Sequence, residues 1–228
     1  MEMNLSVEKA LVVEIAFFEA FFKVHYTKGA RLSYHMPLPT SVAGIFGAML
    51  GWNRAAEGCL GEANGLLFGS KMLFSKGIVT EEATYIEAPK NIRGVAPISL
   101  VNEPSYLVAM AGEEVVIHKY QKQLLIGYSY LPYCGQNDFF VKEINIVGFQ
   151  DVKPSKEIEN YAPKDFVERV ELEKGASLHT LPVVHRYEGV DSTFYFVSGG
   201  GKIILKSEIP CVNGIGLYPI SDFYWVVG

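Results

Sequence analysis

Hydrophobic residues gather in two long stretches near the start of the chain, and the two stretches have different patterns. Residues 11–18 are rich in β-branched and aromatic side chains, which predicts a β-strand. Residues 42–52 carry no charge and place Gly44, Gly47 and Gly51 at spacings of three and four. These spacings predict a helix that carries its glycines along one face and ends just after the last of them.

The glycines indicate that the helix backbone lies close to a neighbour, because each costs roughly 1 kcal/mol against alanine in a helix interior. The neighbour is either a sheet or a phosphate, and we expect Gly47 to face the sheet. Pro37 and Pro39 stiffen the approach to the helix, and Thr40 or Ser41 is expected to cap it with a hydroxyl. The free amides after these two residues form a natural anion site, so we expect the ligand contact at the helix entry.

Most of the remaining apolar segments are short and predict strands. They cover residues 66–79, 84–88, 105–111, 141–149, 166–172, 183–188 and 218–227. Residues 192–197 and 202–206 flank three glycines and predict a hairpin. Residues 113–126 fit a helix with apolar residues four apart, although residues 115–117 would suit a strand equally well. This order predicts an α+β fold with an antiparallel sheet.

Two polar segments interrupt this pattern. Residues 89–104 hold three prolines together with Lys90 and Arg93, and predict an extended surface segment. Residues 151–164 are polar, hold two prolines, and are the best candidate for a boundary. This boundary divides the chain into residues 1–150 and a small β-rich part, residues 151–228.

The composition fits a protein with a substantial core and one basic region. The chain has 228 residues, of which 49% are hydrophobic and 20% are charged. No apolar run is long enough to span a membrane, and the first residues do not resemble a signal peptide, so we expect a cytoplasmic protein. The net charge of −5 argues against a protein that grips long duplex DNA by itself. Residues 20–56, however, hold four cations and no acid, and the local field matters more than the total for a phosphate ligand.

The cysteines and histidines are not arranged for a metal site. Cys59, Cys134 and Cys211 lie far apart without a CxxC spacing, and the five histidines show no HxxxH pattern. We therefore expect no metal and no cofactor.

Catalytic motifs are equally absent from the sequence, which contains neither Gly-x-Ser-x-Gly nor Gly-x-x-x-x-Gly-Lys-Ser/Thr. One set of residues, His118, Lys119 and Tyr34, fits metal-free RNA cleavage, which needs a base, an acid and a cation. Adjacent residues on a helix or strand face different ways, however. We expect a protein without catalytic activity and keep an endoribonuclease as the alternative.

Cations and aromatic residues are dense over residues 23–35. Single-stranded RNA is held in this way, with cations on its phosphates and aromatic rings on its bases, at about 1–3 kcal/mol per stacked base. The candidates in this segment are Lys23, His25, Lys28, Arg31, Tyr34 and His35. A solvated basic loop is the alternative. The three glycines beside Lys202 can let a nucleic-acid backbone approach, or can simply form a tight turn.

Two motifs together resemble the fifth CRISPR-associated protein family, a branch of the RAMP superfamily. The first is a Tyr-x-x-Pro-x-Pro-Thr-like turn with a glycine helix, and its matches are Tyr34, Pro37, Pro39, Thr40, Gly44, Ile45, Phe46, Gly47, Ala48, Leu50 and Gly51. The second is a Pro-x-x-Gly-x-x-Glu-Phe-like element, and its matches are Pro132, Gly135, Asp138 and Phe139. Asp138 replaces the commoner Glu. The resemblance covers about a quarter of the chain, and the order and spacing of the motifs agree with the family.

The resemblance implies a specific fold and role. The fold would be a ferredoxin-like (RRM-like) RAMP domain with an inserted β-hairpin thumb at about residues 78–112, followed by a small β-rich C-terminal part. The role would be that of a non-catalytic subunit of a type I CRISPR surveillance complex (Cascade), which caps the 5′ handle of the crRNA. Its partners would be the crRNA, the backbone subunit, the large subunit and, through the complex, target DNA. A structural assembly protein without RNA contact is a further alternative.

The expected RNA contacts therefore extend beyond the basic segment. They also include Thr40 and Ser41 at the helix entry, Lys90 and Arg93 in the thumb, Gly135, Gln136 and Asn137 in the second motif, and Lys202 beside the glycines.

Overall fold

The computed structural model describes residues 7–24, 30–53, 61–87, 92–135, 139–184 and 191–223. Its helices are α1 (Pro39–Leu50), α3 (Glu114–Ile126) and two 3₁₀ turns, η1 (Lys164–Phe166) and η2 (Ile220–Asp222). Its strands in the first two-thirds of the chain are β1 (Lys9–Phe17), β2 (Glu19–Ala20), β3 (Phe22–Lys23), β4 (Ser33–Tyr34), β5 (Leu67–Phe74), β6 (Ile78–Glu87), β7 (Ile92–Asn102), β8 (Ser105–Gly112) and β9 (Val141–Asp151). The later strands are β10 (Lys153–Ile158), β11 (Tyr161–Pro163), β12 (Val167–Glu171), β13 (Ser177–Val184), β14 (Asp191–Ser198), β15 (Lys202–Val212), β16 (Ile215–Gly216) and β17 (Tyr218–Pro219).

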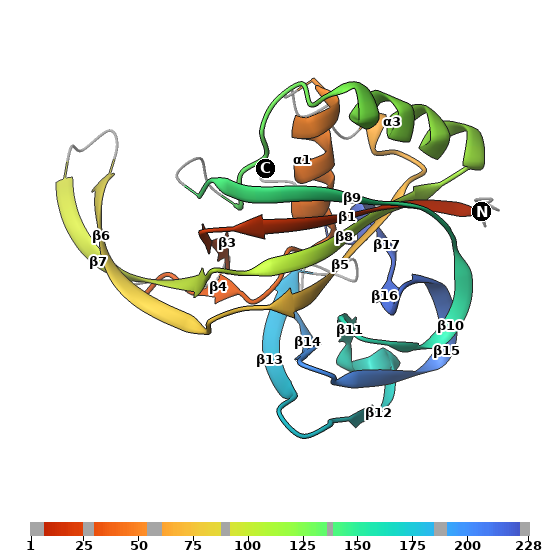
Figure 1. The fold of residues 1–228 in the computed structure, drawn as a ribbon. Helices are drawn as coiled ribbons and strands as arrows, with labels where there is room; N and C mark the ends of the chain where they lie inside the picture. The colour runs from red at the N-terminus through yellow and green to blue at the C-terminus, as the bar shows by residue number, and fades with distance from the viewer. Residues whose placement is uncertain are drawn as a thin grey trace.

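A five-stranded antiparallel sheet in the order β17-β5-β8-β1-β9 forms the centre of the molecule. Two strand–helix–strand units build most of it, β1-α1-β5 and β8-α3-β9, and β8 is inserted between β1 and β5. Both helices lie on the same face of the sheet (Figure 1). The expected mixed α+β class is confirmed.

The interior position of β1, between β8 and β9, follows from its sequence. Its odd-numbered residues from Leu11 to Phe17 are fully buried in the core that also holds the helices. Ala10 and Val12 point to the opposite face, where Ile215 and Leu217 from the end of the chain cover them. Burying a large aliphatic or aromatic side chain stabilises the fold by about 1.5–3 kcal/mol. The strand predicted over residues 11–18 is therefore confirmed as an interior strand of the sheet, whereas the middle position of the five belongs to β8.

A long two-stranded hairpin, β6 and β7, extends from the sheet (Figure 1). It covers residues 78–102, whereas residues 105–112, which the expected thumb included, form β8 of the central sheet. The expectation of an irregular segment over residues 89–104 is wrong for residues 92–102, which form β7. Alternate residues of β7, namely Ala96, Ile98 and Leu100, are buried.

Pro97 is accommodated in β7 because its missing amide is not needed there. Arg31 bridges to this strand, donating its amide to the Pro97 carbonyl and accepting a hydrogen bond from the Ser99 amide. Proline is tolerated in a strand where its ladder position requires no donor. The proline content therefore did not exclude a strand.

The C-terminal part consists of two small sheets, β10-β15-β12 with β16 attached to β15, and β11-β14-β13. The polar segment expected to be a linker or boundary, residues 151–164, is not an irregular linker, because it forms the end of β9, β10 and β11. The chain passes within it from the central sheet to the two small sheets. Four of the six residues of β10 are exposed, so its polarity reflects an exposed strand.

The hairpin expected around the three glycines is also wrong. The flanking strands β14 and β15 both form, but they belong to different sheets and do not pair with each other. Gly199 and Gly200 have φ angles of 64° and 93°, which glycine adopts without strain. The glycines therefore turn the chain from one sheet to the next.

Helix α1 begins earlier than the sequence indicated. Leu38 is its N-cap and Pro39 its first residue, and no described side chain forms a capping hydrogen bond. The capping role expected for Thr40 or Ser41 is wrong, because both residues lie within the first turn. Proline is favoured at the first helical position because its φ is already helical and its missing amide would be unpaired.

The three glycines of this stretch have three different environments, so the single glycine face is also wrong. Gly44 is exposed, Gly47 is buried, and Gly51 lies beyond the last helical residue with a φ of 73°. The helix ends at Leu50, one residue before the predicted end.

Other elements follow the apolar pattern closely. Residues 114–126 form a helix that buries Ile117, Tyr120 and Leu124, which settles the open choice between helix and strand. Of the strand expected over residues 218–227, residues 218–219 form β17 and η2 follows, while residues 224–228 lie outside the described residues. Among the described residues, no helix has the length and apolar character needed to cross a membrane.

Candidate nucleic-acid interface

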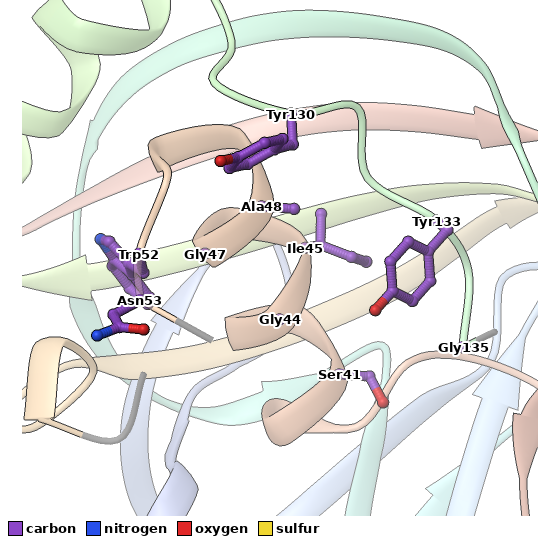
Figure 2. A pocket seen from close by; sticks show the side chains of 10 residues that line it. All are labelled: Ser41, Gly44, Ile45, Gly47, Ala48, Trp52, Asn53, Tyr130, Tyr133 and Gly135. Carbon is purple, nitrogen blue, oxygen red and sulfur yellow. The ribbon is translucent and has the colours of Figure 1, made fainter. Parts of the chain in front are cut away.

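A cavity of about 440 Å³ lies along the face of α1 that points away from the central sheet (Figure 2). The opposite face of the helix, with Val42, Phe46 and Met49, is buried against β5 and β8. The lining comprises Ser41, Gly44, Ile45, Gly47, Ala48, Trp52, Asn53, Tyr130, Tyr133 and Gly135. One wall of the cavity is therefore the small-residue side of α1, and the second wall comes from the segment that follows α3.

That second wall is tied to the C-terminal end of α1. The amides of Ser129 and Tyr130 donate hydrogen bonds to the carbonyls of Met49 and Ala48. The Gln123 side chain also donates to the Leu50 carbonyl, at 2.8 Å. These bonds place the Tyr130 ring over the C-terminal half of the helix, near Ala48 (Figure 2).

The other end of the wall is held by Gly135. The Phe21 amide donates to the Cys134 carbonyl, so the turn lies directly on the chain between β2 and β3. A Cβ atom on Gly135 would come within 1.8 Å of the Phe21 carbonyl oxygen, and its φ is 90°. Only glycine fits this approach. The close contact between Gly135 and Phe21 brings Tyr133 beside the N-terminal half of α1 (Figure 2).

The cavity is electrically neutral, since each of its ten described lining residues is uncharged. Tyr130 is 57% exposed, and nothing lies within 4 Å of the position that a Cβ on Gly44 would take. The cavity thus presents an open patch of helix surface between aromatic rings. Such a surface accepts a flat, neutral group by stacking and van der Waals contact.

The N-terminal end of α1 adds a site for negative charge. The first turn contains no acid, and the amides of Thr40 and Ser41 precede the first intrahelical donor, Val42. Amides at this position, together with the helix dipole, favour an anion. Ser41 lies at this end and lines the cavity, so a neutral space and an anion site adjoin.

The structure thus brings together two of the residues singled out from sequence, Ser41 and Gly135, which line one cavity although they lie far apart along the chain. Thr40 is half-buried in the first turn of the helix. Lys23 is exposed in β3, where it pairs with Ser33 of β4.

Arg31 and Arg93 both lie on the hairpin side. Arg31 is half-buried and bridges to β7, and Arg93 is exposed on β7 itself. Lys202, in contrast, lies in the C-terminal sheet, where its ammonium group is 2.7 Å from the Glu157 carboxylate, which raises the pKa of Lys202. His25, Lys28, Lys90, Gln136 and Asn137 lie outside the described residues.

Tyr34 is part of the core. Only 4% of it is exposed, its ring stacks on Phe196 with centroids 5.9 Å apart, and its hydroxyl donates to the Pro182 carbonyl. These contacts join the N-terminal part to β13 and β14. Its ring therefore packs inside the protein rather than on the surface.

His35, next along the chain, lies against His179 of β13. Their ring centroids are 3.7 Å apart. Burial, and secondarily the charge of His179, lower the pKa of His35 to about 4, and burial also lowers the pKa of His179. Both imidazoles are therefore neutral at pH 7, so the pair contributes packing rather than positive charge.

The three residues considered for RNA cleavage pack against different elements. His118 is exposed on α3 and its ring lies 5.6 Å from that of Phe149 on β9. Lys119 lies over the ring of Tyr120, and the Tyr34 hydroxyl is bound to Pro182. In the described part of the chain, no group of three or more His, Cys, Asp and Glu side chains is placed to hold a metal.

Sequence reasoning missed the aromatic wall of the cavity. Tyr130 and Tyr133 belong to residues 123–135, a run without charge that carries three tyrosines. That run joins a helix to the second motif, and its tyrosines without any charge could have indicated an aromatic surface. Trp52 and Asn53 were not identifiable, because they reach the cavity only through the turn at Gly51.

Comparisons with known proteins return structures but no family. No family model and no curated protein matches the sequence. A chain of a CRISPR RNA-guided surveillance complex is similar over 89% of this chain and 91% of its own, with 14% identity and a TM-score of 0.49. A CRISPR protein from Archaeoglobus fulgidus is similar over 92% and 99%, with 11% identity and a TM-score of 0.45. The functionally uncharacterised protein SMU1763c from Streptococcus mutans is similar over 92% and 100%, with 14% identity and a TM-score of 0.41. At such identities and scores, the function has to be argued from the residues of this chain.

Proposed function

We propose that this chain is a non-catalytic, RNA-binding subunit of a type I CRISPR surveillance complex and that it caps the 5′ handle of the crRNA. One observation carries the proposal. The two motifs that resemble the fifth CRISPR-associated family, the glycine helix and the turn at Gly135, form the two walls of one cavity. Motif residues that meet at a single site are better explained by a shared ligand than by chance.

The topology supports the same proposal. A β1-α1-β5 unit and a β8-α3-β9 unit, with all neighbouring strands antiparallel, are the arrangement expected of a ferredoxin-like RAMP domain. The β6–β7 hairpin interrupts this arrangement between β5 and β8, where the inserted thumb belongs. In this proposal the backbone and large subunits of the complex are protein partners, and target DNA is contacted only through the complex.

The acidic total of the chain is compatible with RNA binding. The anion site at the start of α1 uses backbone amides, which contribute nothing to net charge. Lys23 and Arg31 lie in the segment that precedes this helix. A single strand needs only a few such contacts, because base stacking supplies the rest of the affinity.

The test measures RNA affinity and its salt dependence by fluorescence anisotropy with labelled repeat RNA in the absence of metal. Lys28→Ala combined with Arg31→Ala is expected to weaken binding. The slope of log affinity against log salt should flatten by about 0.7 for each lost phosphate contact, as for single strands. Lys153→Ala, an exposed cation on β10, is the matched charge control and should leave the slope unchanged.

Two outcomes contradict the proposal. Equal slopes for the double variant and the parent show that this face does not hold phosphates. Cleavage of the RNA at the repeat, abolished by His118→Ala, favours the endoribonuclease alternative instead.

A further inference from the structure

The cavity on α1 has two different parts, and no single protein side chain matches both of them. Its described lining is uncharged and partly aromatic, whereas the adjoining helix end offers the amides of Thr40 and Ser41, which have no acceptor within the helix. A nucleotide has the complementary division, with a flat neutral base and an anionic phosphate. We propose, building on the RNA-binding function above, that the cavity receives one unstacked nucleobase while its phosphate lies at the amides of Thr40 and Ser41.

The size of the cavity fits one base. Its volume of about 440 Å³ is in the lower part of the range for small-molecule sites, about 300–1,000 Å³. Gly44 is exposed and faces open space, so a planar ring can lie flat on the helix backbone. A side chain at this position would occupy that space.

The two tyrosines supply the stacking surfaces. Tyr130 lies over the C-terminal half of the helix and Tyr133 beside the N-terminal half, with its hydroxyl directed toward the end where Ser41 lies (Figure 2). Both rings are anchored through their backbone, by the Tyr130 amide on Ala48 and by the bridge between Tyr133 and Phe140. Rings fixed in this way need little reorganisation to accept a base.

The neutral lining has a consequence for how the RNA lies. A backbone that ran through the cavity would place its phosphates against a described lining that holds no cation, which is unfavourable for a charge taken out of water. The base therefore enters the cavity, and the backbone stays at its mouth. Such a site binds one nucleotide of the strand and not its neighbours.

Gly44→Leu provides a direct test because a Cβ at this position meets no described atom outside its own helix within 4 Å, and the rest of the side chain would extend into the cavity. Leucine is also a better helix former than glycine, so the melting temperature should not fall. The matched control is Gly61→Leu, since Gly61 is also exposed, has no atom within 4 Å of a Cβ and does not line the cavity. Affinity is measured with labelled repeat RNA and with a series of the same RNA lacking the base at one position at a time.

For the parent protein and Gly61→Leu, one abasic position is expected to weaken binding by about 5- to 150-fold, the range for loss of one stacked base. Gly44→Leu should bind intact RNA as weakly as the parent binds that abasic RNA. The abasic position should have no further effect on Gly44→Leu. Tyr130→Ala should reproduce this pattern, and Tyr130→Phe should restore parental binding because the ring is kept.

Several outcomes overturn the base pocket while leaving RNA binding intact. One is normal affinity of Gly44→Leu for intact RNA, and another is an equal loss at every abasic position. A third is unchanged RNA binding with loss of a protein subunit from the purified complex, which assigns the cavity to an apolar side chain of a partner. If the parent itself binds no RNA, the proposed function fails and the base pocket fails with it.

Discussion

The two ends of helix α1 differ in how their backbone groups are used. At the C-terminal end, Gly51 turns the chain and the Trp52 amide donates to the Gly47 carbonyl. Ser129 and Tyr130, from a distant segment, donate to the carbonyls of the last turn. This end is closed, because its polar backbone groups are occupied by the protein itself.

The N-terminal end is open. Its N-cap, Leu38, has no side chain that can accept a hydrogen bond, and Pro39 supplies no amide. The next two amides, of Thr40 and Ser41, have no acceptor within the helix, because Val42 is the first intrahelical donor. Among the described residues no group accepts from them, and Ser41 is half-buried and lines the cavity.

This comparison separates a structural end from a binding end on one helix. Changes at the closed end should reduce the free energy of unfolding and leave RNA affinity per folded molecule unchanged. Filling the open face, as Gly44→Leu does, should reduce RNA affinity without lowering the free energy of unfolding. The predictions below test this separation, beginning with the largest expected effect.

Gly135→Ala should have the largest effect, because it acts on the turn that holds the cavity wall. The new Cβ would lie 1.8 Å from the Phe21 carbonyl oxygen and would also require a φ of 90°. We expect a loss of about 4 kcal/mol or more in the free energy of unfolding, measured by chemical denaturation. Gly77→Ala is the control, since Gly77 has a φ of 108° but no atom near its Cβ position. Equal losses for both variants would show that the clash contributes nothing.

Acidification should lower the free energy of unfolding through His35, which lies in the segment that leads into the open end of α1. His35 has a pKa of about 4 in the folded protein, lowered by burial and then by His179, against an ordinary value of 6.5. The unfolded chain therefore binds the proton more readily between pH 6.5 and 4, and stability falls as the pH drops through this window. The loss is at most about 3 kcal/mol, and smaller because the ring is only half-buried.

Thermal melting between pH 7 and pH 4 measures this effect. His35→Gln should flatten the profile, whereas His179→Gln should flatten it only in part, because burial is the larger cause. A profile that is the same for His35→Gln and the parent would assign the acid sensitivity to other groups.

Gly51→Ala should destabilise the closed end by about 1–3 kcal/mol. The residue has a φ of 73°, and its Cβ would lie 2.6 Å from the Ser129 hydroxyl oxygen. Ser129→Gly should recover the steric share of the loss and leave the share that comes from backbone conformation. Denaturation of the single and double variants gives both shares. A fall in RNA affinity with unchanged stability would instead place the RNA-binding site at the closed, C-terminal end of α1.

The sequence predicted elements well wherever one pattern of burial dominated. Residues 11–18 are apolar except for Glu14, and the first half of β1 is buried on both faces. Apolar residues four apart favoured the helix α3, although a strand over residues 115–117 stayed open. Both follow from local periodicity. The prediction failed where tertiary partners decided, as at β7, where Arg31 bonds to the Pro97 carbonyl and the Ser99 amide, so that the position of Pro97 needs no donor.

The candidate site was predictable in the same partial way. Gly135 was found through a motif and Ser41 through its place at the expected helix entry, and the structure places both in one cavity. Tyr34 was selected because aromatic residues next to cations suggest stacking, but burial against Phe196 cannot be read from composition. The three glycines after Ser198 suggested a hairpin because local sequence indicates a turn but not which sheet the next strand joins.

The smallest effect is expected for Gly44→Ala on the open face, and its sign is the informative part. No atom lies within 4 Å of the new methyl group, and Gly44 has an ordinary helical φ. Alanine removes the conformational entropy penalty of glycine, so the free energy of unfolding should rise by about 0.5–1 kcal/mol. RNA affinity should change little, because a methyl group leaves most of the cavity free, in contrast to the leucine that fills it. Denaturation and anisotropy on the same sample give both quantities. A destabilised Gly44→Ala would mean that this face of the helix is packed against the protein, and the difference between the two ends of α1 would then not extend to its open side.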